Sequence, residues 1–338
     1  MPVAELATFA RGLKVNSYAA ALFVNTFKRA AAYKMLHIHS TLRRDEWEEL
    51  DALVTTAGRE IMTGVMHLRQ GAGTLRSVGI GTSLALYNRE SHMPTATLAM
   101  NPLADGEMGR VDYGLAGTPV PFAFNDFQLD LATLMASRQY GDGLDLTQGR
   151  AAGYQVALAH ETLLFNGTPA IAVADRQGTL NTVYGYTTHP ARNTGTAVGD
   201  WGNTTSGYIN AVNTVQAMKL RLRQDRYYGP YRLYVNDVNW TDIGSVNTQT
   251  DRRVVEVLRA DPEILSVENS PRLESGAIIL VDPNPQVVQW VERFTIRPVE
   301  WDEKGGLGSN YRVIGSGAPL IKSTSEQQCG VAHFTGAT

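Results

Sequence analysis

The clearest hydrophobic pattern in the chain predicts an amphipathic helix from about Asp45 to Leu68. Apolar residues recur there at intervals of three and four positions, namely Trp47, Leu50, Val54, Ala57, Ile61, Val65 and Leu68. This spacing places side chains on one face of a helix. Asp45 and Glu48, three residues apart, are typical of a capping box at a helix start. We expect this helix to pack its apolar face on a core.

Between Arg76 and Thr118 the pattern changes to extended sequence interrupted by glycines. Short β-like pieces are expected at 84–87, 95–100 and 111–115. Tyr87 and Tyr113 are the only aromatic residues of this excursion. Two strands of this kind are marginal by themselves in water, and loops this long are usually functional or disordered. We therefore expect the excursion to lie on another surface, such as a second subunit.

Two further helices are predicted after the excursion. The first runs from about Asp126 to Arg138 and is followed by a break at Gly141 and Gly143. The second opens at Asp145, which with Gln148 forms a capping box, and stops at Gly167. Its length of about 22 residues corresponds to roughly 33 Å. It carries small residues on one side (Gly149, Ala152, Gly153 and Ala159). We expect it to be a central strut that lies close against other backbone.

The rest of the chain predicts a mixed region followed by terminal strands. Helices are expected at 206–225 and 252–259, and strands at 232–235, 264–267, 277–281, 287–290, 293–299 and 311–314. The loop 187–203, rich in Gly, Thr and Asn, is expected to be long and exposed. Together these elements predict an α+β fold.

The composition agrees with a folded protein rather than a disordered one. The 338 residues are 43% hydrophobic and 19% charged, whereas disordered chains have low apolar content and high net charge. The 32 glycines exceed the roughly 24 expected from average usage, which favours many turns and extended connections. The length exceeds the usual domain of about 100–200 residues. We expect two packed regions, or one domain with large excursions.

The first forty residues are expected to form a basic arm with helical pieces. The charged side chains of these residues are Arg11, Lys14, Lys28, Arg29, Lys34 and Glu5, which sum to +4. Because the whole chain has a net charge of −3, the rest of the chain carries −7. A basic arm can lie against a polyanion such as nucleic acid. An ordinary solvated helix face explains the same charges and stays open.

Cysteine usage and hydropathy indicate a cytoplasmic protein. Cys329 is the only cysteine, so neither an intrachain disulfide nor a cysteine-based metal site can form, which fits a reducing compartment. No apolar run reaches the roughly 18 residues of a membrane helix. The stretch Tyr18–Val24 imitates a signal-peptide core, but the sequence begins at Met1, and we expect that no signal peptide has been removed.

No catalytic, cofactor-binding or metal-binding pattern is complete in the sequence, so we expect no such site. Four clustered glycines form neither a dinucleotide-binding nor a P-loop motif and are interpreted as turn residues: Gly71, Gly73, Gly79 and Gly81. His37 and His39 lack a third ligand at a recognised spacing. His160 and Glu161 lack the second histidine of a zinc-protease motif. We interpret them as a packed or interfacial polar pair.

Three other candidates have structural interpretations. Asp142 and Asp145 could form a pair of acid–base carboxylates, but Asp145 is already explained as a helix cap. Cys329 has no neighbouring cation to lower its pKa, so we expect a packed thiol. The glycosylation triplets are interpreted as chance matches because no secretion signal accompanies them; they begin at Asn166, Asn203 and Asn239.

Three segments carry a resemblance to a known family. Residues 111–127 read VDYGLAGTPVPFAFNDF, residues 134–145 read LMASRQYGDGLD, and residues 163–167 read LLFNG. In these segments, and in element order from Arg43 to about Phe334, the chain resembles tailed-bacteriophage major capsid proteins and the related encapsulin shell proteins. The resemblance is most specific over residues 111–167. It implies the Hong Kong phage type capsid fold.

The resemblance also implies a domain organisation. Residues 1–43 would be an N-terminal arm, 44–75 a helix leading into the peripheral domain, and 76–122 an extension loop lying over a neighbouring subunit. Residues 123–169 would be the peripheral domain with its spine helix, 170–286 the axial domain, and 287–338 the strands that return to the peripheral domain.

The function implied by the resemblance is a non-enzymatic shell. The partners would be other copies in pentamers and hexamers of an icosahedral shell, packaged double-stranded DNA on the inner face, and separate scaffolding, portal and decoration proteins, with no membrane. The location would be the virion, assembled in the host bacterial cytoplasm. An encapsulin-like compartment around an enzyme cargo is the alternative. Some phage shells link subunits by a Lys–Asn isopeptide bond, but no lysine occurs between Lys34 and Lys219, so the excursion has none to donate.

Overall fold

A computed structural model describes residues 42, 44–93, 95–98, 100–101, 109–111, 113–130, 146–203, 205–246, 252–303 and 308–337. The chain divides into two compact units. One comprises Met1–Thr56, Phe124–Gly153 and Arg297–Ile314, and the other comprises Ala57–Ala123, Tyr154–Ile296 and Gly315–Thr338. Helices and strands are both present, so the predicted α+β class is confirmed. The expected basic arm, apart from Leu42, lies outside the described residues.

The helix predicted over Asp45–Leu68 is present as two helices, α3 (Arg44–Ile61) and α4 (Thr63–Gln70). Met62, with φ −77° and ψ 77°, separates them. The expectation of one continuous helix is therefore wrong. A Cβ on Gly64 would lie 2.8 Å from Leu164 Cδ2, so the start of α4 is positioned by close packing that a local pattern does not contain.

The predicted strut is α6 (Thr147–Asn166). Gly149, Ala152 and Gly153 are buried and allow the close packing that was expected, whereas Ala159 is exposed. At Gly153 an added Cβ would lie 3.2 Å from both Cα and the carbonyl oxygen of Val54 in α3, and at Gly149 it would overlap Leu50. Gly167, with φ +65°, follows the last turn, as the predicted stop requires.

A four-stranded sheet has the order β1-β11-β12-β4, built from β1 (Leu75–Ser77), β11 (Val288–Glu303), β12 (Gly308–Ile321) and β4 (Phe122–Asp130). The two long strands contain the predicted strands near residues 287–299 and 311–314. The helix predicted from Asp126 is wrong as far as Asp130. Exposure alternates along β4, with Phe122 and Phe124 outward and Ala123 and Phe127 less exposed, which is strand periodicity. Residues 131–138 lie outside the described part.

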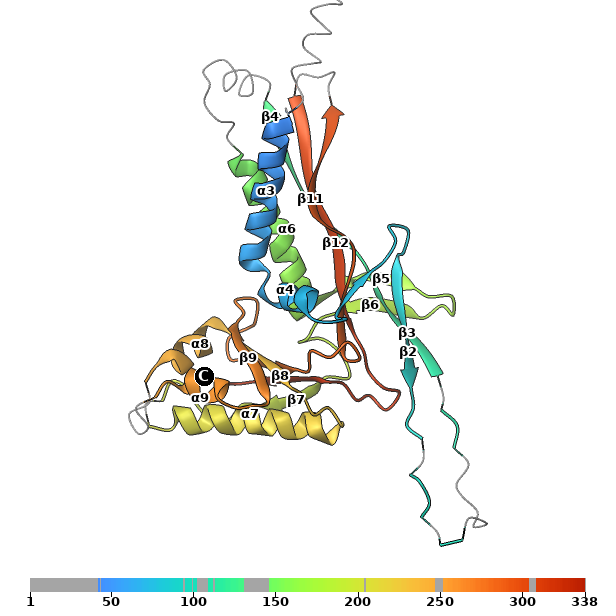
Figure 1. The fold of residues 1–338 in the computed structure, drawn as a ribbon, viewed down its shortest axis with the longest axis vertical. Coiled ribbons are helices and arrows are strands. Elements are labelled where there is room, and N and C mark those ends of the chain that lie inside the picture. Colours follow the sequence, from blue (N-terminus) through green and yellow to red (C-terminus); the bar gives the residue numbers. More distant parts are fainter. Residues whose placement is uncertain are drawn as a thin grey trace, which may run out of the picture. The chain divides into compact units, whose positions relative to one another are not determined.

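The excursion forms an antiparallel ribbon of β2 (Leu84–Glu90) and β3 (Tyr113–Pro119), paired from Leu84↔Pro119 to Glu90↔Tyr113. These two strands confirm the pieces expected near 84–87 and 111–115. The third piece is wrong, because the described residues among 95–100 form no strand. A second hairpin of β5 (Gly167–Ala174) and β6 (Leu180–Tyr184), which the sequence pattern did not predict, packs beside β3 (Figure 1).

A five-stranded sheet has the order β7-β13-β10-β8-β9. Its strands are β7 (Asn193–Thr196), β8 (Tyr231–Val235), β9 (Ile264–Asn269), β10 (Ile278–Val281) and β13 (Val331–Thr335), and the associated helices are α7 (Gly207–Gln224), α8 (Asp237–Gly244) and α9 (Val254–Arg259). The predicted elements at 206–225, 232–235, 252–259, 264–267 and 277–281 are confirmed. Helix α8 and strands β7 and β13 were not predicted.

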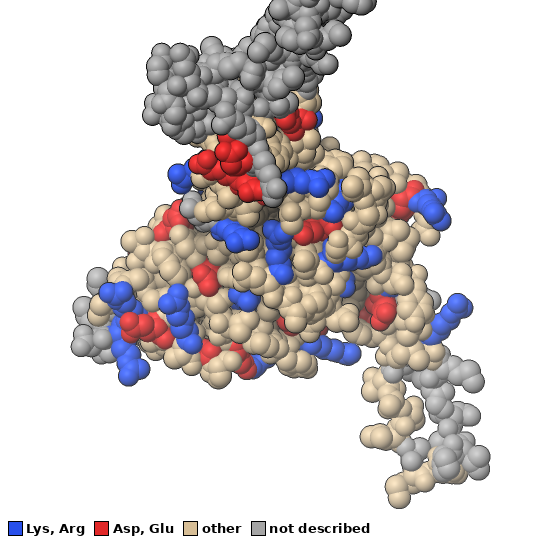
Figure 2. All heavy atoms as spheres, turned by 45° about the horizontal axis from the view of Figure 1, so that its top comes forward, with Lys and Arg blue, Asp and Glu red and all other residues tan. Residues whose placement is uncertain are grey.

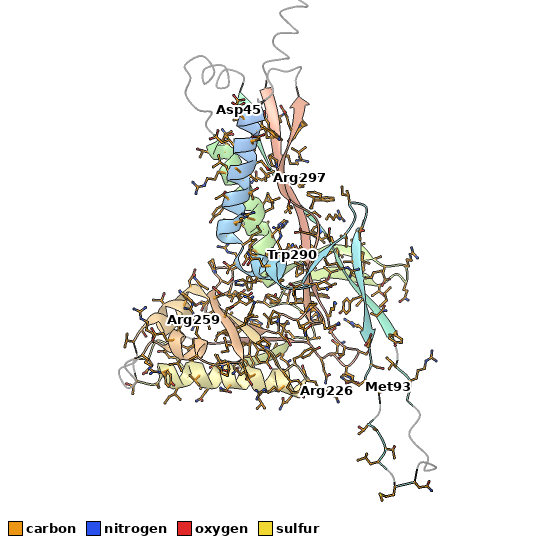
Figure 3. The ribbon with its side chains drawn as sticks, in the orientation of Figure 1. Asp45, Met93, Arg226, Arg259, Trp290 and Arg297 are labelled. Carbon is orange, nitrogen blue, oxygen red and sulfur yellow. The ribbon has the colours of Figure 1, made fainter. Side chains whose placement is uncertain are left out.

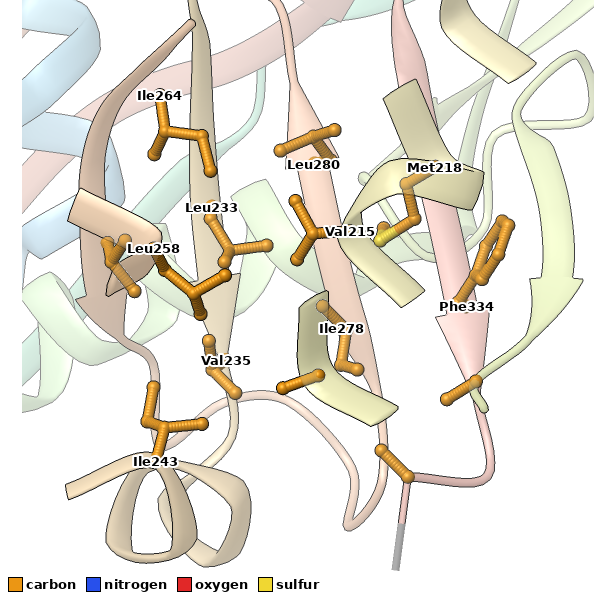
Figure 4. Close-up of a cluster of buried hydrophobic side chains, with 14 of the residues drawn as sticks. Val215, Met218, Leu233, Val235, Ile243, Leu258, Ile264, Ile278, Leu280 and Phe334 are labelled. Atoms are coloured by element: carbon orange, nitrogen blue, oxygen red, sulfur yellow. The ribbon is translucent and has the colours of Figure 1, made fainter. Parts of the chain in front are cut away.

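The core of this sheet lies between its strands and the three helices. Figure 4 shows Val215 and Met218 from α7 facing Ile278 and Leu280 from β10, and all are fully buried. Two expectations are corrected here. The loop 187–203 contains β7 and the buried Trp201. The terminal strand β13 pairs with β7 and β10, so it does not follow β11 and β12 into their sheet.

The close approach of α6 to α3 predicts that a large side chain at Gly153 is not tolerated. Gly153→Leu should lower the free energy of unfolding by about 1–3 kcal/mol, the usual cost of overpacking a core, because its Cβ would already press on the Val54 backbone. Urea unfolding of the purified subunit measures this. Ala151→Leu, at an exposed position of the same helix, is the matched control and should change stability by less than about 0.5 kcal/mol.

Candidate assembly surface

The base of the β2–β3 ribbon belongs to the core of its own subunit. Ala85 and Val120 are buried in a cluster with Val291 and Leu320. The backbone N–H of Ser323 donates to the hydroxyl of Tyr87 at 3.2 Å. The expectation that the whole excursion depends on a neighbour is therefore wrong for this part.

The ribbon is held as far as His92 by the turn before β13. Ser325 N–H donates to the Glu90 carbonyl oxygen at 3.2 Å, and His92 Nε2 lies 2.8 Å from Gln328 Oε1 and 3.6 Å from Glu326 Oε2. These contacts are polar and partly exposed, so each contributes little to stability.

Past His92 the extension exposes large apolar side chains. Met93 begins this segment (Figure 3) and is 59% exposed, while Leu98 is 97% and Met100 105% exposed. Burying such a side chain is worth about 1.5–3 kcal/mol. A segment with three of them and no strand pairing among its described residues gains this free energy only from another surface. We define Met93, Leu98 and Met100 as the extension surface.

The polar pair found in the sequence lies inside the subunit. Glu161 Oε1 accepts from Gly64 N–H at 2.7 Å, and Oε2 accepts from Val65 N–H at 3.1 Å. Burial raises the pKa of Glu161 to about 7, against the lowering effect of these hydrogen bonds and of Arg272. Its carboxyl group caps α4, so the prediction of a packed polar pair is confirmed for Glu161.

His160, the other member of this pair, packs edge-on against Trp290 at 5.6 Å between ring centroids. Burial, and to a smaller extent the charge of Arg69, lowers the pKa of His160 to about 4. The imidazole is therefore neutral at physiological pH. A neutral ring packed on tryptophan is a core residue, which confirms the packed interpretation.

The remaining candidates also have structural roles. Cys329 is fully buried, and burial raises the pKa of its thiol to about 12, so the packed-thiol prediction is confirmed. Asn239 is buried, while Asn166 donates to the Arg272 carbonyl and Asn203 accepts from the N–H groups of Thr205 and Ser206. The clustered glycines lie in the turn after α4 and in the connection between β1 and β2.

The described residues provide neither a metal-binding cluster nor a membrane-spanning helix. Within the described residues no group of three His, Cys, Asp or Glu side chains is placed to hold a metal ion. No helix in this part of the chain is long and apolar enough to cross a membrane. His37, His39, Asp142 and Asp145 lie outside the described residues.

The fold is that of viral and virus-like shells. The virus-like particle protein of Pyrococcus furiosus matches with 13% identity over 85% of this chain and 98% of that chain, at a TM-score of 0.58. The capsid of Myoviridae phage XM1 matches with 10% identity over 81% of this chain and 92% of that chain, at a TM-score of 0.58. The capsid of an empty GTA particle matches with 12% identity over 82% of this chain and 92% of that chain, at a TM-score of 0.53. The chain has the Hong Kong phage type capsid fold, as the sequence resemblance implied.

A family model described as a family of unknown function (DUF6260) matches residues 32–293. This is more than half of the chain, so the protein belongs to that family. No match was found among curated proteins.

The sequence pattern did not single out the extension surface. Met93, Leu98 and Met100 follow neither a helical nor a strict alternating spacing. The sequence feature that could have indicated exposure is that these three residues occur in a segment without aromatic residues, which is too poor in apolar side chains to form a core. Their exposure became evident only once the ribbon had been placed.

The capping role of Glu161 predicts a large effect of its removal. Glu161→Ala leaves two buried N–H groups without an acceptor, at about 1–3 kcal/mol each, so the free energy of unfolding should fall by about 2–6 kcal/mol. Urea unfolding of the purified subunit measures it. Glu49→Ala, an exposed acidic position on α3, is the control and should stay within about 0.5 kcal/mol of wild type. Equal effects of the two substitutions would contradict the capping role.

The raised pKa of Glu161 predicts a pH dependence of its own. The folded state keeps a proton that the unfolded state releases above about pH 4.5, so this contribution to stability is fully present below pH 4.5 and is lost as pH rises through about 7. Glu161→Gln has no such proton. The free energy of unfolding of wild type minus that of Glu161→Gln should therefore be larger at pH 5 than at pH 8. Comparing the two proteins at each pH cancels the effect of the histidines, which titrate in both. A difference in the free energy of unfolding that does not change with pH would refute the raised pKa of Glu161.

Proposed function

We propose that the protein is the major capsid protein of a tailed bacteriophage, which assembles into an icosahedral shell around the double-stranded DNA genome. The observation that carries this proposal is the fold shared with shell-forming proteins over more than four fifths of the chain. The extension surface supports it, because an isolated subunit leaves these apolar groups in water. The role is structural rather than enzymatic, in line with the structural uses of Glu161, His160 and Cys329.

The domain assignment follows from the same proposal. Residues 123–169 with α6 as spine helix form the peripheral domain, residues 170–286 form the axial domain, and residues 76–122 form the extension loop. Because β13 pairs with β7 and β10, we add Val331–Thr335 to the axial domain. Strands β11 and β12 stay with the peripheral domain.

The partners in this proposal are further copies of the chain, in pentamers and hexamers, and packaged DNA on the inner face. On the face drawn in Figure 2, basic and acidic side chains are interspersed and form no broad basic area. The basic residues of the first forty positions are the DNA-contacting candidates in this proposal, because a basic arm can lie against a polyanion. Separate scaffolding, portal and decoration proteins complete the virion, which assembles in the host bacterial cytoplasm.

An encapsulin-like compartment with an enzyme cargo is the second candidate. The Pyrococcus furiosus particle favours it, since 98% of that chain is covered. The contents of particles isolated from the organism that makes the protein separate the two candidates. Nuclease-protected DNA supports the virion, whereas an enclosed enzyme without DNA supports the compartment.

The proposal predicts that shell formation depends on the extension surface. The purified wild-type protein should form closed shells, seen by light scattering and electron microscopy. Replacing Met93, Leu98 and Met100 by serine should abolish shells, because it removes the apolar area that a neighbour would cover, and should shift the melting temperature by less than about 2 °C, since these side chains are outside the core.

The matched control keeps the apolar groups. Replacing Thr95 and Thr97, exposed in the same segment, by serine should leave both shells and melting temperature unchanged. Normal shells from the triple-serine variant would show that the extension surface is dispensable. A wild-type protein that stays monomeric at every concentration and salt would overturn the proposed function itself.

A further inference from the structure

A small pocket lies along the β2–β3 ribbon, where β3 packs beside β6. Its volume is about 160 Å³, and its polar walls come from Arg89, Thr118, Asn181 and His189. All of them belong to one compact unit. A water in the liquid takes about 30 Å³, so the space is ample for one acidic side chain.

The wall is rigid where it is polar. Asn181 Oδ1 accepts from Gly117 N–H at 3.1 Å, and its Nδ2 donates to the Thr179 carbonyl at 3.0 Å. Asn181 is 8% exposed and His189 is 3% exposed. The groups facing the pocket are therefore already oriented before anything binds, which lowers the cost of binding.

The pocket contains a cation without a counter-ion. Arg89 Nε is inaccessible to solvent and has no hydrogen-bond partner among the described residues, and no carboxylate lines the pocket. Burial, followed by the charges of Arg89 and Arg192, lowers the pKa of His189 to about 4. His189 is therefore neutral, and the pocket carries the positive charge of Arg89 alone. A guanidinium pairs best with a carboxylate or phosphate.

The rim of the pocket indicates a protein occupant. Leu115, Leu180 and Tyr184 surround it and are 39%, 69% and 38% exposed. An apolar rim that excludes water from a charged centre is the usual architecture of an interface hot spot. A free anion would leave these three side chains in water.

The chain itself carries the complementary charge. Asp45, Glu49 and Asp51 are exposed on α3, and no ion pair joins them to any of the described residues. A second copy therefore brings exposed carboxylates to the encounter. Electrostatic complementarity of this kind orients partners more than it adds affinity.

We propose that this pocket binds a carboxylate side chain of a second copy of the chain, which pairs with Arg89 while the partner's surface covers Leu115, Leu180 and Tyr184. The proposal rests on the proposed function, since it specifies one contact of the shell. It assigns Arg89 a role in orienting neighbouring subunits.

The assembly test uses Arg89→Gln and Arg89→Glu against Arg176→Glu. Arg176 is exposed in the turn between β5 and β6 and does not line the pocket. Loss of a charge-assisted pair should raise the protein concentration needed for shell formation at least about tenfold for Arg89→Gln, and more for Arg89→Glu. Arg176→Glu should assemble like wild type. Unchanged assembly of a folded Arg89→Gln variant would overturn the proposal.

The occupant is identified by an electron-microscopy map of wild-type shells prepared in chloride buffer without phosphate or carboxylate. An aspartate or glutamate of a neighbouring subunit within about 3 Å of the Arg89 guanidinium supports the proposal. An empty pocket, or one that holds only a small anion, refutes it.

A separate experiment distinguishes failure of the proposed function from failure of the carboxylate pocket. If the wild-type protein forms no shells, the purified subunit is titrated with glutarate, a soluble stand-in for a glutamate side chain, at matched ionic strength. A rise in melting temperature for wild type but not for Arg89→Gln would retain the carboxylate pocket without a shell. Equal responses of the two proteins would remove the pocket as well.

Discussion

The carboxyl group of Glu161 is the interaction on which the arrangement around α6 depends. It accepts the N–H groups of Gly64 and Val65 and so fixes where α4 begins relative to α6. A buried carboxyl group is costly unless it is hydrogen-bonded, and two free N–H groups at a helix start are costly for the same reason. The carboxyl group of Glu161 and the two N–H groups therefore satisfy each other's hydrogen-bonding needs. The break at Met62 follows, because a continuous helix would use these N–H groups within its own turns and leave Glu161 without partners.

Stability of the subunit and the capacity to associate are located in different parts of the chain. The five-stranded sheet has its own core, with Met218 and Leu280 fully buried, and the ribbon base is secured by Ala85 and Val120. The extension beyond His92 adds apolar area without adding to either core. An element whose apolar side chains are buried only by another molecule adds little to the free energy of unfolding of the isolated subunit. The free energy of burying these side chains is gained on association instead. This separation suits the proposed shell, in which a subunit that is already folded would associate through the extension surface.

The elements that the sequence predicted are those whose apolar spacing is local. Helices α6 and α7 and strands β8 to β10 follow from periodicity, and the capsid fold followed from motifs in residues 111–167. Three features could not be predicted this way. The split between α3 and α4 depends on Glu161, about 97 residues away. Strand β4 depends on its pairing in the β11–β12 sheet, which overrides a local helix pattern. The pocket at Arg89 depends on β3 meeting β6, and β5, the hairpin partner of β6, has a run of exposed positions rather than an alternating pattern. Long-range contacts decide all three.

The two surfaces that we assign to association are chemically different, and the difference fits their proposed uses. In the proposed shell, a subunit would occupy both pentamers and hexamers and would meet its neighbours at more than one angle. Met93 and Met100 of the extension surface suit this demand, because methionine is unbranched and adapts its shape to irregular surfaces. The Arg89 pocket suits the opposite demand, since a guanidinium that pairs with a carboxylate in a fixed geometry tolerates little change of angle. In the proposed shell, the adaptable surface therefore tolerates different angles between neighbours, whereas the pocket favours one orientation of the neighbour.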